Sequence, residues 1–172
     1  MVDWTLLITR ALLNGVWLSL TLTAIMLVSG AIALDMWVGD YPPEIRHKYG
    51  PMSARAARLR PLFGAAFFLV VLLVPLLGLS ALRSDLGSVP FVAALAFAAI
   101  SVFVFNLYDL LILDWLFFCT IQPRAMVLPG TEGMAAYRNY RFHFIGFLKG
   151  LGFCILGGLL VAVLWLLLQT LA

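Results

Sequence analysis

Four long runs of apolar residues dominate this chain of 172 residues. They cover residues 6–34, 62–82, 91–121 and 142–171 approximately, and each is long enough to cross a bilayer as a helix, which takes about 20 residues. Inside a bilayer a chain has to pair its own backbone polar groups, and a helix does so within one segment. The sequence therefore predicts an all-α integral membrane protein, a four-helix bundle that forms a single domain over residues 1–172. The first run exceeds the apolar core of a signal peptide, about 7 to 15 residues, so we interpret it as a permanent span.

The charged residues predict how the bundle is oriented. Only 11% of the residues are charged, against about a quarter in soluble proteins, and the net charge of +3 comes from basic residues gathered in loops. The first long loop holds Arg46, Lys48, Arg55, Arg58 and Arg60, and the second holds Arg124, Arg138 and Arg141. The short turn between the second and third runs holds only Arg83. The positive-inside rule then predicts two long cytoplasmic loops and both termini outside, with Arg10 as the one exception, and it leaves no basic surface that indicates a nucleic-acid partner.

Prolines divide the first loop from the second run. Pro61 predicts a break, so that Ser53–Leu59 forms a short interfacial helix that lays Arg55 and Arg58 on lipid headgroups. Pro75 predicts a kink inside the second run, because proline removes one backbone hydrogen bond.

Three polar residues interrupt the third run, namely Asn106, Asp109 and Asp114. They fall within roughly 140° of one another at 100° per residue, so they share one face of a helix. Counted from Phe91 at 1.5 Å per residue, Asp109 lies about 27 Å and Asp114 about 35 Å along the helix, near the far boundary of a hydrocarbon core about 30 Å thick. A carboxylate inside a span usually indicates a functional site or a buried partner.

Two interpretations of these carboxylates stay open. In the first, Asp114 pairs with Lys149, which lies about 33 Å along the fourth run when counted back from Leu171. In the second, Asn106, Asp109, Asp114, Glu132, His143 and Lys149 line a polar pocket for a ligand or a proton relay. Asp109, Asp114 and His143 would be the metal ligands of such a pocket, but no ligand-spacing motif such as HxxxH or ExxH accompanies them. The sequence does not identify a cofactor.

Small residues at every fourth position form two ridges. The fourth run carries Gly146, Gly150, Cys154, Gly158 and Ala162, and the first carries Ala11, Gly15, Ser19 and Thr23. Such ridges let helix backbones approach closely in lipid, so we expect these two helices to pack against each other or against another copy of the chain in a homo-oligomer. Cys119 and Cys154 form no CxxC pair and are interpreted as packed free thiols.

Two segments carry a resemblance. DYPPEIRHKYG at 40–50, together with DLLILDW and LPGTEG within residues 106–133, resembles a family of uncharacterised small four-helix membrane proteins of prokaryotes. The resemblance implies an inner-membrane location and carries over neither an activity nor a catalytic residue.

The sequence holds no GxSxG motif and no glycine-rich phosphate loop. The leading hypothesis is a non-enzymatic integral membrane protein whose cytoplasmic polar cap binds a partner protein, a lipid headgroup or a small ligand. The alternative is an ion- or proton-coupled transporter or channel subunit that uses Asp109, Asp114 and His143, although the first two runs offer no matching carboxylate. A second alternative is a membrane enzyme acting on lipid, with Glu132 or His143 as acid or base. The expected partners are the lipid bilayer and a further copy or another membrane protein.

Overall fold

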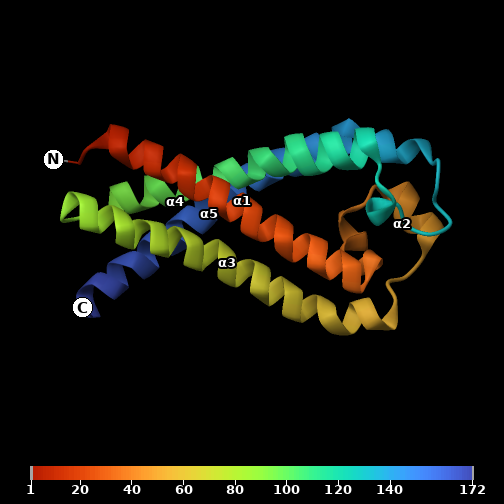
Figure 1. Cartoon of the computed structure of the whole chain (residues 1–172), viewed down its shortest axis with the longest axis horizontal. Helices are drawn as coiled ribbons and strands as arrows, with labels where there is room; N and C mark the ends of the chain where they lie inside the picture. Colours follow the sequence, from red (N-terminus) through yellow and green to blue (C-terminus); the bar gives the residue numbers. More distant parts are fainter. Residues whose placement is uncertain (1, 172) are drawn as a thin grey trace.

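Four long helices and a small cap make up the protein in a computed structural model that describes residues 2–171 (Figure 1). The long helices are α1 (Trp4–Ile32), α3 (Ala54–Leu86), α4 (Phe91–Tyr108) continued by the π-helix η2 (Asp109–Ile121), and α5 (Tyr140–Leu171). All four are long and apolar enough to cross a membrane, and the described residues include no strand. The prediction of an all-helical chain with four membrane-length helices is therefore confirmed.

The most extensive contacts between the long helices follow the order α3, α1, α4, α5. The α4 helix packs extensively against both α1 and α5, whereas α3 packs mainly against α1 and touches α4 and α5 only lightly. In Figure 1 the helices cross toward the end that holds both termini. Toward the other end they diverge into two arms, one of α1 and α3 and one of α4, η2 and α5.

The two small-residue ridges allow α1 and α5 to approach α4 closely. A Cβ atom added to Gly15 would lie 2.5 Å from the Cβ of Val104, and one added to Gly158 would lie 3.0 Å from the backbone nitrogen of Ala99. Both ridges therefore contact α4, where we had expected them to meet each other or another copy. Gly150 lies against Asn106, and Cys154 and Ala162 of the same ridge are buried. Gly146 has open space beside it.

The α3 helix is continuous through Pro61, so the predicted break and the separate helix Ser53–Leu59 are wrong. Proline at 61 removes the hydrogen bond to the carbonyl of Ala57, but Ala57 is exposed near the end of the helix, where water or headgroups can satisfy that carbonyl. The helix start is fixed instead at Ser53, whose side chain accepts from the backbone of Ala56. The buried Asp35 holds this serine by accepting from both its backbone N–H and its hydroxyl.

The cap closes the diverging end of the bundle. It consists of η1 (Leu34–Asp40), α2 (Pro43–Tyr49), η3 (Arg124–Met126) and η4 (Ala135–Arg138). These elements enclose a small core of Val38, Tyr41, Ile45, Phe118, Cys119, Leu128 and Tyr137. The hydroxyl of Tyr137 accepts from the Leu128 backbone at 2.9 Å and lies 2.7 Å from the hydroxyl of Thr131. The two long loops thus form one packed unit against η2.

Contacts at the opposite end set the register between helices. Arg10 pairs with Asp85 of α3 at 2.7 Å, which gives this exceptional arginine a local counter-charge. The side chains of Trp165 and Gln169 both donate to the carbonyl of Val89, 3.2 Å away in each case. The C-terminal end of α5 therefore extends past the N-terminal end of α4, and these two adjacent helix ends are not at the same level.

Candidate functional site

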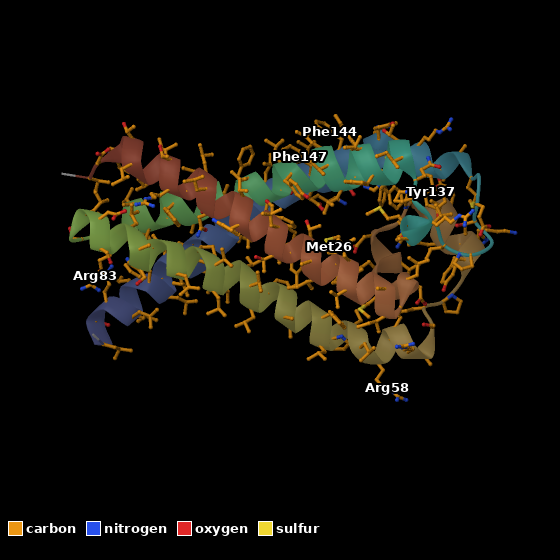
Figure 2. All side chains as sticks on the ribbon, in the orientation of Figure 1. Met26, Arg58, Arg83, Tyr137, Phe144 and Phe147 are labelled. Carbon is orange, nitrogen blue, oxygen red and sulfur yellow. The ribbon has the colours of Figure 1, made fainter. Side chains whose placement is uncertain are left out.

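A cavity of about 560 Å³ lies between the diverging arms, next to the cap. Its polar lining consists of Asp40, Asn106, Asp109, Asp114, His143 and Lys149, and its aromatic lining of Trp37, Phe67, Phe68, Phe105, Phe142 and Phe147. Met26 of α1 and Phe147 of α5 belong to opposite arms, as Figure 2 shows. A mostly apolar cavity with a few convergent polar groups is the usual form of a small-molecule site.

The π-helix arranges two of the carboxylates. Asp109 is the first residue of η2 and Asp114 lies five residues later. In a π-helix the hydrogen bonds run from residue i to i+5 and each turn holds more residues than in an α-helix, so residues five apart come closer to the same face. Both carboxylates line the cavity. The segment ends at Gln122, which takes the left-handed conformation with φ 51°.

Asp114 bonds to His143 and not to Lys149, its partner in the first of the two interpretations. The carboxylate Oδ1 lies 2.9 Å from Nδ1 of His143, whose side chain is only 5% exposed. The expectation of the Lys149 pair is wrong because it counted both helices from level ends, whereas α5 extends past α4 and so brings His143 level with Asp114. Nε2 of His143 is buried and has no partner among the described residues.

Asp109 and Lys149 line the same cavity without pairing. The described residues form two ion pairs, Arg10–Asp85 and Asp114–His143, so no oxygen of Asp109 lies within 4.0 Å of the Lys149 ammonium. Neither side chain forms a hydrogen bond with another described residue. The neighbouring Asn106 does have a partner, because its amide donates to the carbonyl of Phe147 at 3.2 Å.

Asp40 is a lining residue that our sequence reasoning missed. It stands in the first loop, and the cap core of Val38 and Tyr41 brings it to the cavity. Part of its side chain stays exposed, yet the protein packed around it excludes enough water to raise the pKa of Asp40, an effect that nearby Arg60 reduces. The only sequence signal was its position between Gly39 and the Pro42–Pro43 pair, which marks a structured turn.

Glu132 does not join this site. Its carboxylate accepts from the backbone N–H of Gly130 at 3.1 Å within its own exposed turn, and it is not among the residues that line the cavity. The structure therefore brings together five of the six predicted site residues. Over residues 2–171 it shows no group of three or more His, Cys, Asp or Glu side chains arranged to hold a metal ion.

The chain matches no family model, no curated protein and no solved structure. Any inference about its function therefore rests on the cavity and its charges.

Proposed function

We propose that this protein is a non-enzymatic membrane protein that binds a small ligand in the cavity between its two arms. The observation that carries the proposal is the convergence of Asp40, Asp109, Asp114, His143 and Lys149 on one cavity of about 560 Å³. Ionisable groups within or beside a span usually mark a functional site, and here five of them from three elements face one space. The aromatic walls supply apolar contact, and the polar groups orient the ligand.

A matched pair of cavity variants tests the binding. Gly146 lines the cavity and Gly152 does not, while both are exposed positions of α5 with no heavy atom within 4 Å of an added Cβ. Protein purified in mild detergent is weighed intact by native mass spectrometry. We expect a bound small molecule on the wild type and on Gly152→Trp, and its loss from Gly146→Trp. The absence of any bound mass from the wild type, or equal retention by both variants, contradicts the proposal.

The hydrogen bond between Asp114 and His143 favours a second candidate, proton-coupled transport. These two groups and Asp109 line one cavity, and carboxylate and imidazole groups within a span are the usual proton relays of proton-coupled carriers. Proteoliposomes with an imposed pH gradient and a pH-sensitive dye inside test this candidate. We expect proton flux that Asp109→Asn and Asp114→Asn each abolish, and flux that is unchanged in both variants rules the candidate out.

We further propose that the protein lies in a prokaryotic inner membrane with its cap in the cytoplasm and both termini outside. Arg58 and Tyr137 lie at the cap end and Arg83 at the other end in Figure 2. Eight of the eleven basic residues lie within residues 35–61 and 122–141, which hold the cap and the adjoining starts of α3 and α5. Two exposed positions report the orientation in a variant whose native cysteines are replaced by alanine. On intact cells an impermeant maleimide should label Ser88→Cys but not Glu132→Cys. The reverse pattern refutes this orientation.

A further inference from the structure

The unpaired charges of the cavity carry both signs. Among residues 2–171, neither Asp109 nor Lys149 has an ion-pair partner, whereas Asp114 bonds to His143 and Arg60 lies beside Asp40. An anionic and a cationic group that face one space without reaching each other match a ligand that carries one charge of each sign. Such a ligand satisfies both groups at once, whereas a simple cation or anion leaves one of them bare.

The cavity lies at the depth of lipid headgroups. The α4 helix contains 18 residues, which span about 27 Å. Counted from Phe91, Asp109 therefore lies close to the far boundary of a hydrocarbon core about 30 Å thick. Lipid phosphates and headgroup amines occupy this level. Lys149, whose chain is long enough to extend toward the interface, belongs to the same zone.

The cavity also opens toward lipid. Phe68 of α3 and Ile145 of α5 line it, yet their side chains are 71% and 41% exposed. The two helices touch only lightly, and both present apolar surface on either side of this seam. A molecule that entered here from the bilayer would leave its apolar part between α3 and α5.

We propose that the cavity binds the headgroup of a zwitterionic phospholipid with a primary ammonium, the ammonium on Asp109 and the phosphate on Lys149. The acyl chains leave through the seam between α3 and α5. This inference rests on the proposed function and names the ligand class of the same cavity. A primary ammonium is favoured over a quaternary one because its N–H groups donate to a carboxylate, which strengthens the bond and fixes its direction.

Native mass spectrometry with defined lipids tests the proposal. Dioleoyl phosphatidylethanolamine, phosphatidylcholine and phosphatidylglycerol have the same acyl chains and differ only in the headgroup. We expect the ethanolamine lipid to bind about tenfold more tightly than either of the others, since a hydrogen bond to a charged group contributes about that factor. Asp109→Asn should remove this preference, and Asp109→Glu, which keeps the charge, should retain most of it.

Lys149→Met should weaken the ethanolamine and choline lipids alike, because both carry the phosphate. Lys48→Met and Asp85→Asn are the controls, since neither residue lines the cavity. Equal binding of the three lipids, or a preference that survives Asp109→Asn, overturns the proposal. Equal binding of the three lipids is the result expected if Lys149 only contacts the headgroups of surrounding bilayer lipids.

Two further measurements distinguish a failure of this lipid proposal from a failure of the proposed function. Glycerophosphoethanolamine carries the headgroup without acyl chains, so binding as tight as that of the lipid overturns the lipid assignment in favour of a soluble phosphoamine. Gly146→Trp should abolish binding of the ethanolamine lipid. If a different lipid binds and Gly146→Trp removes it, the proposed function stands and this inference fails; if no probe depends on Gly146, both fail.

Discussion

The contact between α4 and α5 leads to a quantitative prediction about two adjacent glycines. A Cβ atom at Gly158 would lie 3.0 Å from the nitrogen and the Cβ of Ala99 and 3.1 Å from its Cα. Carbon atoms are comfortable at about 3.5–4.0 Å, and these neighbours are backbone and Cβ atoms that no rotamer change can move. In Gly158→Ala, therefore, α5 has to withdraw from α4 by a few tenths of an ångström.

The expected cost is that of overpacking a close contact, about 1–3 kcal/mol. Gly157 is the control, because an added Cβ there meets no heavy atom within 4 Å. Both substitutions gain the same intrinsic helix propensity of alanine over glycine, about 1 kcal/mol, which cancels in the comparison. We expect the free energy of unfolding of Gly158→Ala to lie about 1–3 kcal/mol below that of Gly157→Ala.

Unfolding measured by titration with sodium dodecyl sulfate in mixed micelles, followed by tryptophan fluorescence, gives this difference. Replacing the same residues by leucine should widen it, since a larger side chain at 158 separates the helices further. Equal unfolding free energies for the two alanine variants would refute the close approach of α5 to α4. They would also undermine the register that brings His143 level with Asp114.

Three further predictions concern the cap and the opposite end. Tyr137→Phe should lower the unfolding free energy by about 1–3 kcal/mol in denaturant titration, because it leaves a buried N–H unpaired, whereas the partly exposed Tyr140→Phe should cost clearly less. Although burial raises the pKa of Asp35, the hydrogen bonds from the N-cap serine of α3 hold it below its ordinary value of 3.8. The ionised Asp35 therefore stabilises the folded state above pH 3.8, and this contribution is lost as the pH falls through the lower pKa of the folded state. A pH series of thermal unfolding should show the loss in the wild type and not in Asp35→Asn. Arg10→Gln should cost less than about 1 kcal/mol despite the short pair with Asp85, since both side chains are substantially exposed, and a loss above 2 kcal/mol would contradict this reasoning.

The sequence predicted the helices because apolar runs of this length leave a chain little choice in a bilayer. The third span, from Phe91 to Ile121, has the predicted ends, and its polar face of Asn106, Asp109 and Asp114 does line a cavity. What the apolar pattern lacks is any sign of the π-helix. Helical periodicity alone does not reveal a change from i+4 to i+5 hydrogen bonds within a continuous apolar run.

The partner of Asp114 could not be predicted for a different reason. Pairing across two helices depends on where one begins relative to the other, and here that offset is set by two distant side chains that bond to the carbonyl of Val89. Asp40 escaped notice in a similar way, because the cap core that carries it to the cavity forms between loops far apart in the chain. Both misses concern non-local contacts that neither hydropathy nor residue spacing encodes.

Of the four long helices, α3 has the lightest packing, and the largest part of that packing is against α1. Asp109, Asp114, His143 and Lys149 belong to η2 and α5, on the most extensively packed arm. Phe67 and Phe68 belong to α3, which packs mainly against α1. A change in the tilt of α3 would therefore alter the width of the cavity without moving Asp114 or His143, which both belong to the other arm. The two walls of the cavity thus differ in kind, since one supplies the charged groups and the other an aromatic surface.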